Sequence, residues 1–275
     1  DDMVHTFFLW RCADFTAKAA RVLGNQADEK EYTALAEKTK LAFQLKYFDK
    51  EKGTYGPYGG NIFALKMGIP AVERERVIAA LKADIKANND HLDTGIFGTQ
   101  FFFEVLSENG LNELAFNAMN QHTQPGYGWW IEQGATTTWE QWNGSGSRNH
   151  PMLGGGITWF YRKLAGMNSD PNDAGYRNII FRPQPAGDIS FASYSNLTPY
   201  GNAVISWKKE NGKFLMDVTV PPGCTSTCYI PTENNKIKEG GKPLKRSKGI
   251  LSFRKEPGYT VIELVSGEYK FAAAL

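Results

Sequence analysis

Between residue 3 and about residue 165, apolar residues recur at intervals of three and four, which predicts a largely helical first part of the chain. A first long helix should end at Gly24 and Asn25, and its apolar stripe consists of Val4, Phe8, Cys12, Phe15, Ala19 and Val22. A second helix should begin at Asp28, with Glu31 placed as in a capping box. Its stripe consists of Tyr32, Leu35, Ala36, Thr39 and Phe43. We expect these two helices to form an antiparallel hairpin.

Long glycine-bearing loops then alternate with shorter helices. The loops are expected at residues 48–60, 90–99 and 126–142, and the helices at 61–67, 70–85, 101–109, 111–121 and 151–164. Paired helices with elaborate loops at one end predict part of an α/α toroid, in which the loops converge on a central cleft. A helical repeat array is the competing interpretation, but no fixed sequence period supports it.

After Asp170 the pattern changes to short β-branched or alternating runs separated by Pro, Gly and Asn. Strands are predicted at residues 178–182, 203–208, 213–220, 226–230, 250–253 and 260–265. Gly201-Asn202 and Asn211-Gly212 are typical of hairpin turns. This spacing predicts an antiparallel β-sandwich of roughly 100 residues. The polar segment Met167–Asp173 is the expected linker, so the predicted domains are 1–168 and 169–275.

Composition narrows the class of partner. The chain has 275 residues and a formal net charge of +2, from 31 basic and 29 acidic residues, which gives no reason to expect nucleic acid or an anionic membrane. No stretch approaches the ~18–20 apolar residues of a membrane-spanning helix. Histidines at positions 5, 91, 122 and 150 show no metal-ligand spacing, and we expect no metal or other cofactor. Free thiols are favoured for Cys12, Cys224 and Cys228, although a Cys224–Cys228 disulfide stays open.

The most informative segment is GYGWWIEQGATTTWEQW, residues 126–142. It contains four of the seven tryptophans and two carboxylates, Glu132 and Glu140; the tryptophans are Trp129, Trp130, Trp139 and Trp142. A pyranose offers C–H groups to aromatic faces and hydroxyls to carboxylates, so this segment indicates a sugar site. From the residues alone, Glu140 could equally be catalytic or a structural residue that caps a helix or pairs with Arg. Glu132 fits a loop-bracing or ion-paired role better than catalysis.

Three further polar residues in the loops could bind sugar hydroxyls. His150 follows Glu140 by ten residues, and His91 and Asp93 belong to the loop at residues 90–99. The competing interpretation is local capping: Asn149 and His150 would cap the last helix, and Asp93 would cap the helix that follows it.

At this point a resemblance to a known family becomes specific. GATTTWEQW, followed by NHPMLGGGITWFYRKLAG, resembles the last catalytic-domain segment of the family 78 α-L-rhamnosidases. HLDTGIFGTQFFFEVLSENG is similar to a loop and helix of that family, and VTVPPGCTSTCYIP to strands of its C-terminal sandwich. The resemblance covers essentially the whole chain. It implies an (α/α)6 barrel followed by a β-sandwich, and hydrolysis with inversion by two carboxyl groups ~6.5–9.5 Å apart.

The resemblance also assigns roles to residues. It makes Glu140 the general base, Trp129, Trp139 and Trp142 aromatic walls of the rhamnose pocket, and His150 a sugar contact. The acid of the family, a Glu in an RxERxGWxGD-like segment, has no counterpart here, and about seven helices are counted against twelve. The chain therefore resembles the C-terminal half of a rhamnosidase. A second departure is Gly60-Asn61-Ile62, where the family usually has a Gln-Thr-Ala-type start.

The sequence thus predicts an inverting glycoside hydrolase that removes terminal α-L-rhamnose from a rhamnose-containing carbohydrate, with these 275 residues alone inactive. The alternatives are a non-catalytic carbohydrate-binding fragment, or another α/α-barrel glycosidase or phosphorylase. A phosphorylase is disfavoured because the tryptophan segment has no basic residue before Arg148. Exposed apolar faces of a half barrel should cause self-association or reduced stability. The compartment stays open, because any signal peptide would precede residue 1; a periplasmic or extracellular location is slightly preferred to a cytoplasmic one.

Overall fold

The computed structural model describes residues 2–232 and 236–275, and its contacts divide the chain into two compact units, residues 1–156 and 157–275. The division falls within helix α8 (Gly155–Trp159). The sequence places the domain boundary between residues 168 and 169, and that boundary stays a prediction.

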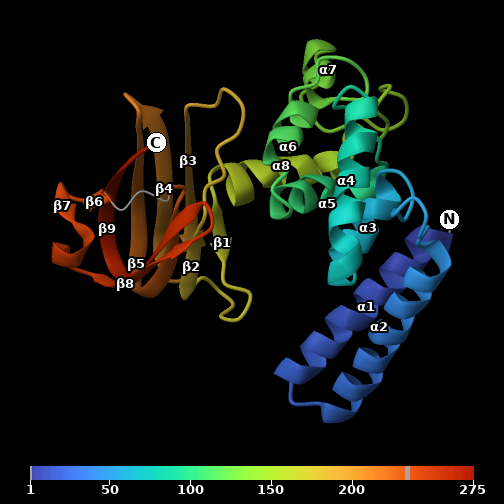
Figure 1. Cartoon of the computed structure of the whole chain (residues 1–275), viewed down its shortest axis with the longest axis horizontal. Coiled ribbons are helices and arrows are strands. Elements are labelled where there is room, and N and C mark those ends of the chain that lie inside the picture. Colours follow the sequence, from blue (N-terminus) through green and yellow to red (C-terminus); the bar gives the residue numbers. More distant parts are fainter. Residues whose placement is uncertain (1, 233–235) are drawn as a thin grey trace. The chain divides into compact units, whose positions relative to one another are not determined.

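The first unit is helical (Figure 1). Its elements are α1 (Asp2–Val22), α2 (Gln26–Tyr47), α3 (Gly59–Met67), α4 (Ala71–Ala87), α5 (Ile96–Glu108), α6 (Asn112–Met119), α7 (Tyr127–Glu132) and the short 3₁₀ helix η1 (Pro151–Gly154). Among the described residues, each expected helix has a counterpart, but the helix expected at residues 151–164 is three successive segments, of which η1 and the start of α8 belong to this unit. The one-turn helix α7 lies in the tryptophan segment, where no helix was predicted.

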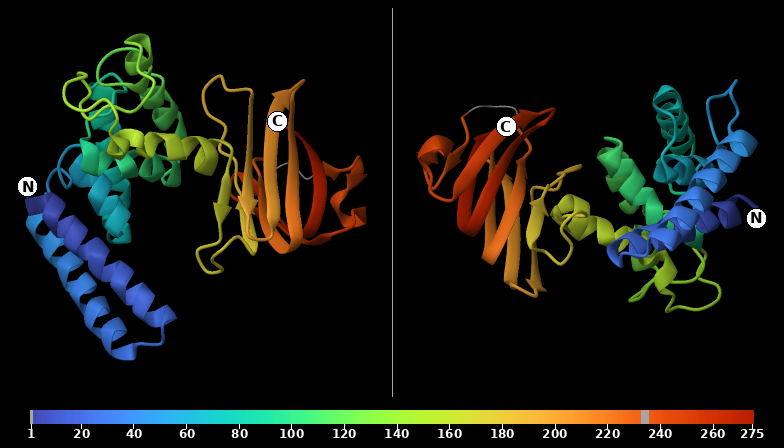
Figure 2. Two further views of the ribbon diagram at one scale, coloured as in Figure 1. Left: turned by 180° about the vertical axis from the view of Figure 1, so that it is seen from behind. Right: turned by 90° about the horizontal axis from the view of Figure 1, so that it is seen from below.

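Helices α1 and α2 form the predicted antiparallel hairpin, which the two views of Figure 2 also show. The prediction of the packed face of α1 is wrong, because α1 buries Ala13, Ala17 and Ala20, whereas Phe15 and Val22 of the predicted stripe are 72% and 86% exposed. Small alanine side chains allow two helix axes to approach closely, and the bulkier apolar stripe is left on another face.

The start of α2 also differs from the prediction. The helix begins at Gln26 rather than Asp28, and Asn25 is its N-cap. The Asn25 side-chain oxygen accepts the Asp28 backbone N–H at 3.2 Å, which satisfies one of the amides left free at a helix start. On α2 the predicted face is confirmed, because Ala36, Thr39 and Phe43 are buried.

Two helices that are apolar on nearly all sides form the core of the first unit. Helix α3 buries seven residues and α5 buries eight, which is typical of helices enclosed by others. Phe7 of α1 stacks on Phe63 of α3, with ring centroids 4.4 Å apart, and packs edge-on against Phe101 of α5 at 5.2 Å. Burying each such ring contributes roughly 1.5–3 kcal/mol, so α3 and α5 form a firm base for the loops around them.

The second unit begins with the end of α8 and the π-helix η2 (Phe160–Leu164) and continues as strands. These are β1 (Met167–Ser169), β2 (Asn178–Phe181), β3 (Phe191–Thr198), β4 (Gly201–Glu210), β5 (Lys213–Ile230), β6 (Lys238–Glu239), β7 (Lys242–Pro243), β8 (Ile250–Glu256) and β9 (Tyr259–Ala274), with the 3₁₀ helix η3 (Leu244–Arg246) before β8. Strand β3 was not predicted, because its sequence, FASYSNLT, does not place apolar residues on one face and polar residues on the other.

The long strands β5 and β9 connect two layers of the β-unit. Along β5 the first part, residues 213–219, pairs with β4, while Thr225–Cys228 pair with β2 in parallel orientation. Strand β9 pairs with both parts, and the register shifts between Val220 and Thr225. A bulge at such a position lets a strand turn from one layer of a sandwich into the other. The two strands predicted at residues 213–220 and 226–230 are therefore one bulged strand.

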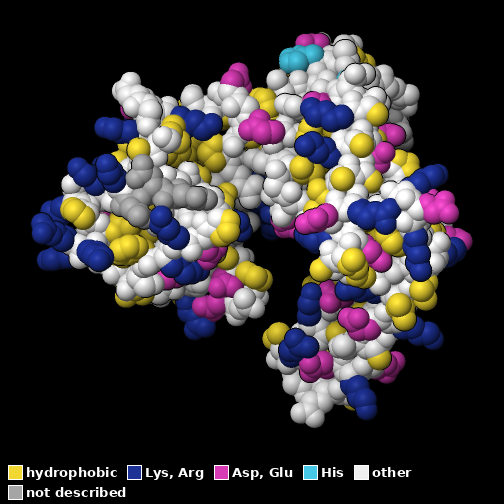
Figure 3. Space-filling view, viewed as in Figure 1, with side chains coloured by type: hydrophobic (Ala, Val, Ile, Leu, Met, Phe, Trp, Pro, Cys, Tyr) yellow, Lys and Arg dark blue, Asp and Glu magenta, His cyan; other side chains and the backbone are white. Residues whose placement is uncertain are grey.

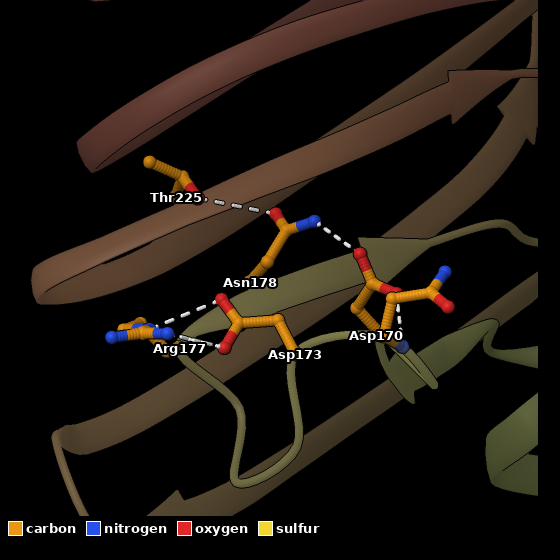
Figure 4. Close-up of polar contacts among 6 residues, drawn as sticks. Asp170, Asp173, Arg177, Asn178 and Thr225 are labelled. Carbon is orange, nitrogen blue, oxygen red and sulfur yellow. Dashed lines mark hydrogen bonds and ion pairs between the residues drawn. The ribbon is translucent and has the colours of Figure 1, made fainter.

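The predicted linker Met167–Asp173 belongs to the sheet rather than being unpaired. Its first three residues form β1, which pairs antiparallel with β2. Figure 4 shows how the following turn is held: Asn178 donates from its amide to Asp170 at 2.8 Å, and Arg177 pairs with Asp173 at 2.8 Å. The segment is thus a structured hairpin at the start of the β-unit.

Candidate active site

The loop that follows α7 folds back on itself between residues 138 and 150. The Glu140 backbone N–H donates to the Ser147 carbonyl at 2.8 Å, and the His150 N–H donates to the Thr138 carbonyl at 2.8 Å. The Thr138 hydroxyl also donates to the His150 carbonyl at 2.8 Å. The β-branched run at Thr136–Thr138 is therefore not a strand. It is one arm of an irregular loop that holds Glu140 and His150 on opposite arms.

Two of the tryptophans fix this loop to the helical core. Trp130 is buried, stacks on Trp142 with ring centroids 4.4 Å apart, and donates its indole N–H to the Trp142 carbonyl at 3.0 Å. Trp142 donates its own indole N–H to the carbonyl of Thr94 at 3.3 Å. The pair thus connects the tryptophan loop to the loop at residues 90–99. Residues of both loops can contribute to one binding site only if the loops are held together in this way.

The other two tryptophans differ in exposure. Trp139 is buried beneath the guanidinium of Arg148, which lies 4.8 Å from its ring centroid, and Trp129 meets it edge-on at 6.2 Å. Trp129 and Trp142 are half-buried, so each keeps a surface that a ligand could contact. Trp130 and Trp139, by contrast, support the loop from within.

The Glu140 carboxylate is held by one backbone amide. Its Oε2 accepts the Ser147 N–H at 2.9 Å, and the carboxylate lies close to Gly146, where an added Cβ would be 2.8 Å from Oε2. Among the described residues Glu140 neither caps a helix nor pairs with an arginine, so the structural role considered from sequence is not the one it has. Its Oε1 has no hydrogen-bond partner in the described part of the chain.

The second carboxylate of the segment has a structural contact. Glu132 lies at the end of α7 and its Oε1 is 2.6 Å from Nδ1 of His122. Both side chains are more than half exposed. This contact between α7 and the loop before it fits the loop-bracing role predicted for Glu132.

The predicted sugar-contacting histidines are placed differently. His150 is the N-cap residue of η1, but its side chain makes no capping bond, and its buried Nε2 has no partner within the described residues. His91 has both ring nitrogens occupied, Nδ1 by the Asn88 carbonyl at 3.0 Å and Nε2 by the Thr123 hydroxyl at 2.7 Å. Of the two histidines, His150 is therefore the one with an uncommitted ring nitrogen, which is enclosed by the protein.

Asp93 lies at a pocket of about 470 Å³, which is also lined by Thr94, the residue that accepts the Trp142 indole N–H. The pocket is bounded by the start of α1 and by the two loops that precede α3 and α5, including His5, Tyr55, Gly60, Asp93 and Phe97. The N-cap of α5 is Gly95 without a side-chain cap, so the expectation that Asp93 caps this helix is wrong. Its exposed carboxylate is available to the pocket.

Sequence reasoning missed the contacts that hold the loop lining this pocket. Asn61 is fully buried, and its side-chain oxygen accepts from the Thr54 hydroxyl and the Tyr55 N–H, both at 2.9 Å. The Tyr55 hydroxyl donates to Glu73, and burial together with this bond holds the pKa of Tyr55 well above its usual range. Asn61, noted above as a departure from the family pattern, braces the loop that precedes α3.

Other site chemistry is limited in the described ranges 2–232 and 236–275. They contain no group of three or more His, Cys, Asp or Glu residues placed to hold a metal ion. Cys12, Cys224 and Cys228 are all free thiols, and burial raises the pKa of Cys228. No helix among these residues is both long and apolar enough to cross a membrane.

Helical hairpins with a tryptophan-rich loop that carries a carboxylate, followed by a β-sandwich, are typical of the helical-toroid class of glycosidase domains. The family comparisons agree. Residues 1–164 match the bacterial alpha-L-rhamnosidase 6 hairpin glycosidase domain, and residues 166–245 match the bacterial alpha-L-rhamnosidase C-terminal domain. The chain belongs to the bacterial α-L-rhamnosidase family.

Individual relatives carry the same description. An alpha-L-rhamnosidase of Formosa agariphila is 31% identical over 98% of the chain, and one of Streptomyces avermitilis is 29% identical over 98%. The chain spans 31% and 26% of the lengths of these two relatives.

Solved structures show the same architecture. The alpha-L-rhamnosidase from Dictyoglumus thermophilum superposes with a TM-score of 0.89 at 33% identity, over 98% of this chain and 31% of that one. The Streptomyces avermitilis enzyme complexed with L-rhamnose superposes with a TM-score of 0.88 at 29% identity, over 99% and 27%. The predicted toroid-plus-sandwich fold class is confirmed, although the sandwich is not wholly antiparallel, because β2 and β5 pair in parallel.

Proposed function

We propose that this chain is the C-terminal part of an inverting α-L-rhamnosidase in which Glu140 is the general base. The observation that carries the proposal is the Glu140 carboxylate, held by a backbone amide in a loop rich in tryptophan, within a chain of this family. The substrate is a glycan or glycoside that ends in α-L-rhamnose. The proposed domains are residues 1–168, part of the (α/α)6 barrel, and 169–275, the sandwich.

The hydrogen bonding of Glu140 supports the role of base. Oε2 accepts the Ser147 N–H, which fixes the orientation of the carboxylate, while Oε1 has no partner among the described residues. A general base needs one oxygen free to accept a proton from the attacking water. Inversion requires a second carboxyl group, the acid, ~6.5–9.5 Å away, which protonates the leaving oxygen as the water attacks from the opposite face.

The neighbouring residues support a rhamnose pocket. Trp129 and Trp142 keep partly exposed rings that can face the C–H groups of a sugar, and His150 keeps a free Nε2 for a hydroxyl. Trp130 and Trp139, both buried, would act by fixing those rings rather than through broad contact. Asp93 at the adjoining pocket would bind a further hydroxyl, and His91 would position its loop.

The role of Glu140 is tested with Glu140→Gln in the full-length protein that carries this chain. Glutamine keeps the shape of the side chain and can still accept the Ser147 N–H, but it cannot take a proton. The kcat for an aryl α-L-rhamnoside should fall by roughly 10²–10⁴. Glu132→Gln is the matched control and should keep kcat within about threefold. Unchanged hydrolysis by Glu140→Gln would show that Glu140 is not the base.

A second part of the proposal is that the 275 residues alone do not turn over substrate. They contain no counterpart of the family's acid segment, and without an acid the leaving oxygen must depart unprotonated. The purified chain should release no p-nitrophenol from p-nitrophenyl α-L-rhamnoside above a Glu140→Gln sample of the same chain. Turnover that is lost with Glu140→Gln would refute inactivity while keeping the base.

A third part concerns association. The α1 stripe that contains Phe15 and Val22 is exposed, and α2 adds Leu41 and Leu45 at 56% and 78% exposure. Large apolar side chains left exposed along both helices favour contacts between molecules. We therefore propose that the isolated chain self-associates through the α1–α2 hairpin.

A further inference from the structure

The β-unit has a groove that the proposed function does not use. It has a volume of about 700 Å³ and lies between η3, the end of β8 and the start of β9. Its apolar side is formed by Ile237, Leu244 and Phe253, and its rim by Lys245, Arg246 and Lys255. Grooves of this size are in the range that encloses small ligands or one to two units of a polymer.

The groove lies in the most basic part of the chain. Residues 236–255, KIKEGGKPLKRSKGILSFRK, contain eight Lys or Arg and a single acidic residue, Glu239, whereas the whole chain has a net charge of only +2. Figure 3 shows Lys and Arg side chains gathered over the β6–β8 part of the β-unit. A local excess of this size attracts anions far more strongly than the average composition suggests.

The cations at the rim differ in how far they are already neutralised. Arg254 is paired with both Glu256 and Glu263, at 2.9 Å each. Lys245, Arg246 and Lys255 have no ion pair among the described residues. These three are therefore the charges available to an incoming ligand.

Phe253 makes the groove more than an electrostatic patch. The strand register pairs Phe253 with Ile262 and Lys255 with Thr260, so these two β8 side chains lie on the same side of the sheet. Phe253 is nonetheless 41% exposed, whereas Ile262 is buried. An exposed ring next to unpaired cations offers a face for the C–H groups of a sugar and charges for its acidic substituent.

We propose that this groove binds an anionic polysaccharide, with Lys245, Arg246 and Lys255 contacting carboxylate or sulfate groups and Phe253 contacting a sugar ring. The ligand chemistry is a sugar unit with a negative charge, and the proposal does not depend on hydrolysis by the helical unit. A concave groove with an aromatic wall favours a saccharide over a duplex nucleic acid or a lipid surface, for which a broad charged face would suffice.

The test measures binding of the purified 275-residue chain by calorimetry at low salt. The probes are oligogalacturonate, dextran sulfate of similar length, and neutral dextran. The anionic probes should bind, with affinity falling as salt rises, and neutral dextran should not. The two anionic arms distinguish carboxylate from sulfate as the preferred group. Equal binding of neutral dextran, or binding of neither anionic probe, would overturn the proposal.

Variants locate the binding. Lys245→Ala/Arg246→Ala/Lys255→Ala should lower the affinity for the anionic probes by roughly tenfold or more. Each exposed ion pair contributes modestly, and the variant removes three of them. The matched control, Lys30→Ala/Lys38→Ala/Lys82→Ala, removes the same charge from exposed helix positions and should change affinity less than about twofold. An equal loss in both triple variants would show that net charge rather than the groove is responsible.

Phe253→Ala separates a saccharide groove from a general polyanion surface. This substitution should lower the affinity for oligogalacturonate by about three- to tenfold. It should leave the weak binding of a DNA duplex or of phosphatidylglycerol vesicles unchanged. Thermal unfolding confirms that each variant is folded. Duplex or vesicle binding as tight as that of the saccharide, and insensitive to Phe253→Ala, would refute a saccharide site.

Discussion

At the scale of single residues, the orientation of Glu140 depends on its neighbour in space, Gly146. Gly146 has a φ of +75°, which places the Ser147 amide against the Glu140 carboxylate. Both needs, the left-handed backbone and the space for Oε2, are met by a residue without a Cβ. The proposed base is therefore oriented by a glycine six residues away in sequence.

Gly146→Ala should therefore impair catalysis more than it impairs folding. The new Cβ would lie 2.8 Å from Glu140 Oε2, so the carboxylate must move. In the full-length protein we expect kcat for an aryl α-L-rhamnoside to fall by roughly 10²-fold, because a displacement near 1 Å is costly at a reacting centre.

Gly134→Ala is the matched control. Gly134 has a φ of +78°, and an added Cβ there meets nothing within 4 Å. Both variants should lose about 1 kcal/mol of stability from the strained alanine, but only Gly146→Ala should lose activity. Equal kcat values for the two variants, measured beside their unfolding curves, would show that Gly146 does not position the base.

At the scale of elements, the β1–β2 hairpin depends on Asp170. Its carboxylate accepts the Asn172 backbone N–H and the Asn178 amide, each at 2.8 Å (Figure 4). These bonds, the Asn172 amide first, lower the pKa of Asp170 below its ordinary value. A carboxyl group with a lowered pKa in the folded state stabilises that state while it is ionised.

The contribution of Asp170 should therefore depend on pH. It is fully present above the unfolded pKa of about 3.9 and is lost as pH falls through the lower folded value. At pH 7, Asp170→Asn should reduce protection from hydrogen exchange in β1 and β2 by at most about fivefold, because the site is largely solvated. At a pH below the folded pKa of Asp170, wild type and variant should converge.

Asp188→Asn is the control, since Asp188 is exposed and makes no hydrogen bond among the described residues. It should leave exchange in β1 and β2 unchanged at both pH values. A defect in Asp170→Asn that persists undiminished at low pH would indicate a steric cause rather than the ionised carboxylate.

At the scale of elements, part of the fold and of the site could be predicted from the sequence. Periodicity located the α1–α2 hairpin and most strands, because those signals are local. Periodicity predicted the wrong packed face of α1. Phe15 is more hydrophobic than Ala17, but the smaller Ala17 lets α2 approach more closely and is the residue that is buried. Periodicity also divided β5 at Pro221 and Gly223, where the structure has a bulge. The tryptophan motif located the site, but the Ser147 amide and Asn61 could not be foreseen because their partners are chosen by loop folding.

At the scale of the whole molecule, the exposed apolar stripe of α1 is the feature on which the proposed self-association of the isolated chain depends. Phe15 and Val22 lie on a face that α2 does not cover, although the helix is apolar there. The chain spans only 31% of its Formosa agariphila relative, so we propose that further helices of the barrel cover this face in the full-length protein. In the isolated chain, we expect a second copy of the chain to bury this apolar face.

Phe15→Lys/Val22→Lys should therefore shift the isolated chain towards monomer. Lysine is a good helix former, so α1 should persist, while each buried apolar side chain lost from an interface weakens it by up to roughly 1.5–3 kcal/mol. Sedimentation velocity should show concentration-dependent association of the wild-type chain, and an association at least tenfold weaker for the variant. Phe191→Lys/Leu197→Lys, at positions 71% and 82% exposed on β3, makes the same change in the β-unit and should leave association intact. A wild-type chain that stays monomeric at all concentrations, or one dispersed only by the β3 variant, would refute association through the α1–α2 hairpin.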